Sequence, residues 1–322
     1  MTELRDQLTK YLTDAHSIEV QALSQLRPAV KVAGDERLAA ALREHVTETE
    51  GHERTVRELL EARDAAPSRL EDVVMAAGGA GFLLFARLQP DTPGKLLAHS
   101  RSYEALESAS YELLALTAER AGEDDVAGAA RRIRDEERRM GERLEELTPR
   151  SVEASLRELG EPDLHVQLRR YLADAHAIEQ QAIALLERAP QLVEDESLAA
   201  VFSDHLAETR DHAELVEERL DALGGDPSSL KDAAMRLGAL QWGAFFQGHP
   251  DTPGKLAAFA YAFEHLEIGG YAQLRLVAEK AGDEETAQLV SRLLEQERTA
   301  AGRIEGRFED AVSASLRAVG AA

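Results

Sequence analysis

YLTDAHSIEVQA, at residues 11–22, returns as YLADAHAIEQQA at residues 171–182. Two further stretches recur at the same offset of 160 residues: PDTPGKL at 90–96 and 250–256, and ASLR at 154–157 and 314–317. Self-similarity at one fixed offset is the signature of a duplicated structural unit. The sequence therefore predicts two domains of one fold, residues 1–160 (the first copy) and 161–322 (the second copy). A residue kept in both copies is a better candidate for function than a residue found in only one.

The composition restricts the class of protein. Of the 322 residues, 44% are hydrophobic and 30% are charged, which is typical of a globular chain. The 60 acidic residues outnumber the 37 Lys and Arg and give a net charge of −23, which argues against nucleic acid or an anionic membrane as a partner. The absence of cysteine excludes disulfides, thiolate zinc sites and iron–sulfur clusters. The N-terminus has no signal-peptide pattern and no stretch is apolar for long enough to span a bilayer, so we expect a cytoplasmic protein.

Hydrophobic residues recur with the helical period through both copies. In the first copy they predict helices over residues 3–29, 35–62, 92–121 and 124–147, followed by a short closing helix over 151–159. Thr92 before Pro93 marks a helix start, and Gly122 marks a helix end. Short turns join the first helix to the second and the third to the fourth, and a long crossover with a short helix joins these two hairpins. Because this is the connectivity of ferritin-like bundles, we expect an all-α chain of two tandem ferritin-like four-helix bundles.

The crossover is unusually apolar. It contains VVMAAGGAGFLLFA at residues 73–86, and its counterpart is AAMRLGALQWGAFF at residues 233–246. Segments of this kind are too apolar to remain exposed. We expect them to lie across the bundle end, or to pack one copy against the other or against a second chain in a homo-oligomer.

Acidic residues and histidines interrupt the apolar face of each helix. In the first copy these residues are Glu19, His45, Glu48, His52, Glu107 and Glu137. In the second copy they are Glu179, His205, Glu208, His212, Glu267 and Glu297. Glu107 and Glu137 lie fifteen residues before and after the turn at Gly122, and Glu19 and Glu48 lie at similar distances from the first turn. At a rise of about 1.5 Å per residue, these carboxylates lie at nearly the same height in the bundle.

Four glutamates in an apolar bundle need neutralisation, because desolvation costs several kcal/mol per ion. Protons, cations or arginines can provide it, and the arginines kept in both copies are Arg132 and Arg143, repeated as Arg292 and Arg303. Two divalent ions would balance four carboxylates, and a carboxylate and imidazole ligand set suits iron, manganese or zinc. A bundle with one glutamate on each helix and added histidines is the layout of di-iron and di-manganese proteins.

Several motifs resemble a known family. They are DAHxIExQ (residues 14–21), HxxETxxH (45–52), ExxExxxY (104–111) and an ExER segment (295–298). Together they are similar to the YciE/YciF-type stress-protein family of ferritin-like domains, most closely in EHLEIGGYAQLRLVAEKAG at 264–282 and HLAETRDHAELVEERL at 205–220. The resemblance covers most of each copy except the crossover. It implies a ferritin-like bundle with a carboxylate-bridged metal pair.

The resemblance also implies a ligand set. Its members are Glu19, Glu48, His52, Glu107 and Glu137 in the first copy, and Glu179, Glu208, His212, Glu267 and Glu297 in the second. Glu104 and Glu264 are alternates. Tyr111 and Tyr271 are either donors to a ligating carboxylate or ordinary core tyrosines.

The fourth helix departs from the better-known ferritin pattern, in which Glu-x-x-His occurs on both the second and the fourth helix. Met140 and Ala300 stand where histidine is expected. His16 and His45 are the candidates for the missing imidazole, although for both we favour simple pairing with a glutamate. Without an additional imidazole, the site is mononuclear, weak or vestigial.

Two hypotheses for function follow. The first is a ferritin-like metal-binding protein that holds iron or manganese, with zinc also allowed, in each copy and reacts with oxygen or peroxide as an oxidase or ferroxidase. The second is a non-enzymatic helical interaction module with a vestigial metal site. Binding of divalent ions to the folded chain would distinguish them, because it raises the melting temperature.

Overall fold

The computed structural model describes residues 2–67, 92–158, 163–225 and 251–322, and the regular structure in these ranges is entirely helical. The chain divides into two compact units, Met1–Glu161 with Gly320–Ala322 and Pro162–Val319. The apolar segments at 73–86 and 233–246, for which we expected a packing or oligomer role, lie outside the described residues. Within the described ranges, no helix combines the length and apolar character needed to cross a bilayer.

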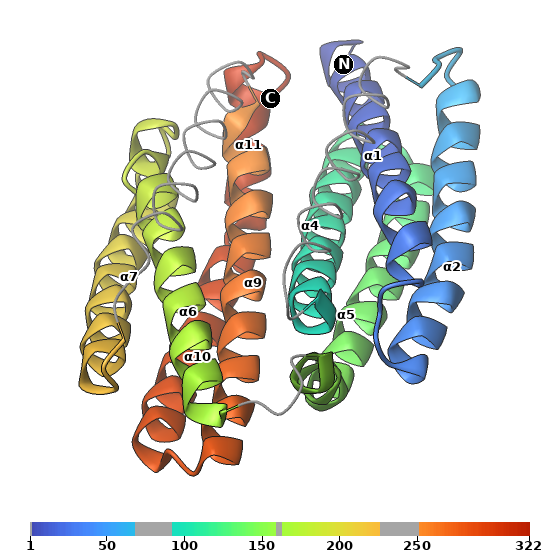
Figure 1. The fold of residues 1–322 in the computed structure, drawn as a ribbon. Coiled ribbons are helices and arrows are strands. Elements are labelled where there is room, and N and C mark those ends of the chain that lie inside the picture. The colour runs from blue at the N-terminus through green and yellow to red at the C-terminus, as the bar shows by residue number, and fades with distance from the viewer. Residues whose placement is uncertain (1, 68–91, 159–162, 226–250) are drawn as a thin grey trace. The chain divides into compact units, whose positions relative to one another are not determined.

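The first unit is a bundle of two antiparallel hairpins (Figure 1). Its helices in the described ranges are α1 (Thr2–Ala29), α2 (Glu36–Glu61), α4 (Thr92–Ala121) and α5 (Asp124–Glu158). Helix α1 packs against α2 and α4, and α5 packs against α4 and α2. The four helices therefore enclose one core, as the sequence predicts.

The second unit repeats this arrangement. Its elements in the described ranges are α6 (Leu164–Leu186), the 3-10 helix η1 (Ala189–Gln191), α7 (Glu196–Ala222), α9 (Thr252–Ala281), α10 (Glu284–Glu305) and α11 (Phe308–Ala318). Helix α6 packs against α7 and α9, α10 packs against α9 and α7, and α11 packs against α9.

The two copies differ where a short closing helix was expected. In the first copy that expectation is wrong, because α5 continues through Pro149 to Glu158. In the second copy the chain breaks between α10 and α11, with Gly306 at the end of α10. Glu146, a good helix former, stands in the first copy where the second has Gly306.

Two of the repeated motifs meet in space. The Gly94 amide of PDTPGKL donates a hydrogen bond to Ser155 Oγ of ASLR at 2.8 Å. The second copy has the same bond, from the Gly254 amide to Ser315 Oγ at 2.7 Å. Because the first N–H groups of a helix lack partners within it, these serines complete the starts of α4 and α9.

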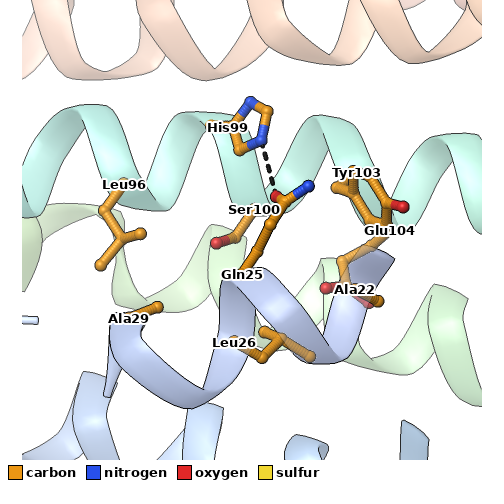
Figure 2. Close-up of a pocket in the computed structure, with 9 residues that line it drawn as sticks. All are labelled: Ala22, Gln25, Leu26, Ala29, Leu96, His99, Ser100, Tyr103 and Glu104. Carbon is orange, nitrogen blue, oxygen red and sulfur yellow. Dashed lines mark hydrogen bonds between the residues drawn. The ribbon is translucent and has the colours of Figure 1, made fainter. Parts of the chain in front are cut away.

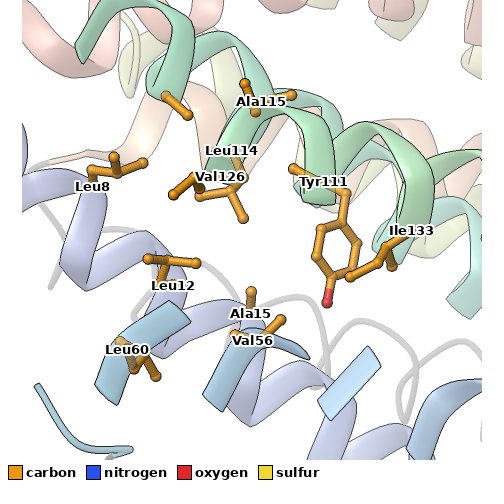
Figure 3. Close-up of a cluster of buried hydrophobic side chains, with 13 residues drawn as sticks. Leu8, Leu12, Ala15, Val56, Leu60, Tyr111, Leu114, Ala115, Val126 and Ile133 are labelled. Atoms are coloured by element: carbon orange, nitrogen blue, oxygen red, sulfur yellow. The ribbon is translucent and has the colours of Figure 1, made fainter. Parts of the chain in front are cut away.

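The core of the first unit contains two separate apolar clusters. One is built around Leu8, Leu12, Leu60 and Ile133 (Figure 3), and the other around residues such as Leu38, Leu42, Leu97 and Leu144. Each cluster receives side chains from all four helices. A band of polar side chains lies between the two clusters.

Candidate metal centre

The polar band occupies one level of the first bundle. Each helix passes between the two apolar clusters in a short interval: Ala15 to Ala22 on α1, Leu42 to Val56 on α2, Leu97 to Tyr111 on α4 and Ile133 to Met140 on α5. Every interval carries a buried glutamate or histidine. The hairpin geometry thus brings acidic residues from distant parts of the sequence to a common height.

Six of these side chains form two overlapping groups. Their ligand atoms come from Glu19 on α1, His45 and His52 on α2, Glu104 and Glu107 on α4, and Glu137 on α5. One group contains His45, Glu104, Glu107 and Glu137, and the other contains Glu19, His52 and Glu137. Within each group all ligand atoms lie within 4.8 Å of one another. Glu137 belongs to both groups, and each group has one imidazole.

The second bundle has the same two groups. The first group contains His205, Glu264, Glu267 and Glu297, and the second contains Glu179, His212 and Glu297. All these residues are buried. The constellation therefore recurs at corresponding positions, and these buried clusters can hold a metal ion.

Many oxygen atoms in the groups have no hydrogen-bond partner. Both carboxylate oxygens of Glu107, and both of its counterpart Glu267, are buried without one. A buried polar atom without a partner costs about 1–3 kcal/mol, and more when it is charged. A cation placed among these oxygens would satisfy them together.

Burial also changes the acidity of the carboxyl groups. Desolvation, reinforced by neighbouring carboxylates, raises the pKa of Glu107 and of Glu267 well above the usual value. Desolvation raises the pKa of Glu19 to about 8 and that of Glu137 to about 7. Without a metal, part of this cluster therefore holds protons near neutral pH.

Each of the two cluster histidines of the first bundle directs one ring nitrogen into the cluster and the other towards an outer carboxylate. His45 Nε2 lies 2.9 Å from Glu104 Oε2, while its Nδ1–H donates to Glu48 Oε2 at 3.0 Å. His52 Nδ1 lies 2.7 Å from Glu137 Oε1, while its Nε2–H donates to Glu136 Oε2 at 2.7 Å. Metal-binding histidines characteristically donate their second N–H to a carboxylate in this way.

Glu48 and Glu208 are not placed with the other predicted ligands. Glu48 is exposed and bonds the outer nitrogen of His45. Glu208 is half-buried and pairs with Arg303. On a helix with about 3.6 residues per turn, a glutamate three residues after a histidine is rotated about 60° away from it.

His45 and His205 take the place expected for Glu48 and Glu208. His45 precedes His52 by seven residues, which puts the two within about 20° on the same helix face. That spacing, repeated in the second copy, was the available sequence signal. His16 lies outside the groups, with its Nε2 3.0 Å from Glu53 Oε1.

For the tyrosines, the sequence left two alternatives open, a donor to a carboxylate or a core residue. The Tyr111 hydroxyl, at the edge of the apolar cluster in Figure 3, donates to Glu19 Oε1 at 2.5 Å. Tyr271 donates to Glu179 in the same way. Both tyrosines are therefore donors to the acidic cluster as well as core residues.

Arginine does not neutralise the buried acids in the described part of the chain. No ion pair there joins an arginine or lysine to the buried glutamates of either cluster. Arg143 pairs instead with Glu44 at 2.6 Å, and Arg132 is exposed. The arginine-paired alternative therefore has no support from the ion pairs.

The fold and the clusters define a class of protein: a tandem pair of helical bundles, each with a buried glutamate and histidine cluster. The chain belongs to the family described as "Domain of unknown function (DUF892)", whose model matches residues 3–157 and again residues 163–317. Protein YciF of Escherichia coli (strain K12) is 29% identical over 136 residues, which are 39% of this chain and 79% of YciF. No solved structure matches the chain. The resemblance to YciF-type proteins is thus confirmed, and the family domain occurs here in duplicate.

Proposed function

We propose that each bundle binds two divalent metal ions, one in each group of ligands, and that Glu137 and Glu297, which belong to both groups of their bundles, would help to hold both ions. The observation that carries this proposal is the convergence of buried, unpartnered carboxylate oxygens around one imidazole per group. We assign one pair of ions to residues 1–160 and the other to residues 161–322.

Charge and donor chemistry favour iron or manganese. Each cluster combines four carboxylates with two imidazoles. Two divalent ions balance four carboxylates, and the mixed oxygen and nitrogen donor set suits iron and manganese, and also zinc. Because both imidazoles come from the second helix of each bundle, the missing histidine of the fourth helix leaves neither group without one.

The side chains around the groups hold these ligands in place. Glu48 and Glu136 fix the ring orientation of His45 and His52. Tyr111 fixes one oxygen of Glu19, which leaves the other oxygen for a cation. An iron or manganese pair, when bound, supplies redox chemistry towards dioxygen or peroxide, which is the activity we propose to test.

Metal analysis is the direct experiment. Protein purified without added metal, or loaded with Fe(II) under anaerobic conditions, should contain about four metal ions per chain, two groups in each of two bundles. Glu107→Gln should lower this number, whereas the matched change Glu36→Gln at an exposed position should not. Addition of air to the Fe(II)-loaded protein should then produce oxygen uptake and a new absorbance.

The result that would overturn the proposal is equally clear. If the chain takes up no Fe(II), Mn(II) or Zn(II), and its melting temperature is indifferent to all three, the helical interaction module is the better description. Metal binding without oxygen uptake would keep the metal site and remove the oxidase activity.

A further inference from the structure

A pocket in the first bundle leads to one member of its metal-ligand group. The pocket lies between α1 and α4, and its polar lining consists of Gln25, His99, Ser100 and Tyr103, with Glu104 beside them (Figure 2). His99 Nε2 lies 2.9 Å from Gln25 Oε1. The cavity is small, about 10 Å³, which is room for the centre of about one water molecule.

Glu104 connects this pocket to the ligand cluster. Glu104 lines the pocket, and its Oε2 atom lies 2.9 Å from His45 Nε2. A solute that reaches the pocket is therefore one side chain away from the group formed by His45, Glu104, Glu107 and Glu137.

The second copy keeps the frame of the pocket and loses its polar groups. The remaining lining residues recur identically 160 positions later: Ala22, Leu26, Ala29, Leu96 and Glu104 become Ala182, Leu186, Ala189, Leu256 and Glu264. The four polar residues become Leu185, Phe259, Ala260 and Phe263. The rings of Phe259 and Phe263 are neighbours, with centroids 6.4 Å apart.

The two copies therefore differ in the residues around the ligand groups and not in the ligands themselves. The ligand groups of the two copies are identical in residue type, whereas the residues beside Glu104 that are polar in the first copy are apolar at the matching positions of the second. A divalent ion entering a protein needs oxygen or nitrogen atoms to replace the water it sheds, and an apolar path offers none.

We propose that this pocket is the route by which water, and a divalent cation that has shed most of its own water, reach the metal centre of the first copy, and that the second copy lacks it. The inference rests on the proposed metal-binding function. It predicts that metal bound in the first copy exchanges quickly with the solution and that metal bound in the second copy exchanges slowly.

Chelator-driven release tests this proposal. The full chain is loaded with Co(II), mixed rapidly with excess EDTA, and followed by the cobalt absorbance. We expect a fast and a slow phase of equal amplitude. The variant Glu267→Gln/Glu297→Gln should retain only the fast phase, and Glu107→Gln/Glu137→Gln should retain only the slow phase.

Substitutions that swap the lining residues between the two copies then test the route itself. The variant Gln25→Leu/His99→Phe/Ser100→Ala/Tyr103→Phe should slow the fast phase about tenfold, the factor that corresponds to about one lost hydrogen bond. The reciprocal variant Leu185→Gln/Phe259→His/Ala260→Ser/Phe263→Tyr should accelerate the slow phase. The amount of bound cobalt should stay the same in both.

The outcomes distinguish a failure of the proposed metal binding from a failure of the proposed access route. If the wild type and all the variants fail to bind cobalt, the proposed function is overturned. Normal loading with a single release rate, or with rates that the exchanged linings leave unchanged, overturns only the access route. If the fourfold variants do not fold, Ser100→Ala and His99→Phe replace them, and normal release in both single variants also overturns it.

Discussion

The buried carboxylates explain the chemistry of this protein at the scale of single residues. Glu107 and Glu267 have both oxygens buried and without hydrogen bonds, and desolvation raises the pKa of each carboxyl group well above its usual range. A proton would therefore compete with a metal ion bound at the proposed site for the same oxygens. In the metal-free protein, these groups bind protons more tightly in the folded chain than in the unfolded chain, so stability depends on pH.

The sign of that dependence follows from the pKa values. Burial raises the pKa of Glu19 from 4.5 to about 8. Burial acts to lower the pKa of His52, but the carboxylates of Glu137 and Glu19 outweigh it and raise the value from 6.5 to about 9. A group that binds its proton more tightly in the folded chain contributes stability that is complete below the unfolded pKa and is lost as pH rises through the folded pKa.

The free energy of unfolding of the metal-free protein should therefore fall between about pH 5 and pH 9, by about 1 kcal/mol per pH unit for each titrating group. Denaturant titrations in EDTA across this range measure it. Glu107→Gln should reduce the slope, because it removes one titrating carboxyl group. Stability that rises with pH, or a slope that Glu107→Gln leaves unchanged, would contradict this interpretation.

A second residue-scale difference concerns the orientation of the histidines. In the first copy Glu136 accepts the Nε2–H of His52 at 2.7 Å. In the second copy Gln296 stands at the matching position, and His212 Nε2 is buried without a hydrogen-bond partner. A carboxylate on the outer nitrogen orients the ring and increases its basicity as a ligand.

Glu136→Gln should accordingly weaken metal binding by the first copy about tenfold, the lower end of the range for such outer partners. The reverse change, Gln296→Glu, should strengthen binding by the second copy. Calorimetric titration with Mn(II) measures both effects. Glu142→Gln, at an exposed position on the same helix, is the matched control, and the interpretation fails if it behaves like Glu136→Gln.

At the scale of the helices, the end of one element completes the start of another. Ser315 of α11 accepts the Gly254 amide of α9 and donates to the Asp251 carbonyl at 3.1 Å. This contact gives PDTPGKL and ASLR, which recur together in the sequence, a shared structural role. It also holds the helix that carries Glu264 and Glu267 in its axial position.

Ser315→Ala should lower the free energy of unfolding by about 1–2 kcal/mol, the cost of leaving a helix-start N–H without a partner. Ser313→Ala is the control on the same helix, because its hydroxyl donates to the Glu309 carbonyl at an exposed site. Denaturant unfolding compares the two variants. A Ser315→Ala protein as stable as Ser313→Ala would show that the contact does not support the helix.

The sequence predicted the helices and the level of the buried acids better than it predicted the directions of single side chains. Hydrophobic period and turn residues such as Gly122 locate the elements, and counting residues from a turn gives the height of Glu107 and Glu137. The direction of Glu48 depends on a rotation of about 60° around α2, which a count of heights does not include. The contact between Glu136 and His52 joins two helices far apart in sequence, so no local pattern encodes it.

At the scale of the whole chain, the duplication provides two complete sets of ligands. Every member of a group comes from a single unit, and Glu137 and Glu297 belong to both groups of their own bundle. Neither cluster therefore contains a residue from the other unit. The duplication leaves each copy free to change its surroundings while keeping its ligands, as the linings around Glu104 and Glu264 indicate.

Because each ligand group lies within one bundle, a substitution in one bundle should leave the metal binding of the other unchanged, and the intact chain can be used to test this. Glu297→Gln removes the carboxylate that the two groups of the second copy share, with little change of shape. It should reduce bound metal from about four ions per chain towards two, because both groups of that bundle lose a ligand. In calorimetric melting with and without Mn(II), the unfolding of the first unit should still gain about 2.7 kcal/mol per bound ion at a metal concentration of a hundredfold the Kd. The second unit should gain little, and Glu137→Gln should give the mirror-image result. A single substitution that removed the metal response of both units would contradict two self-contained metal centres.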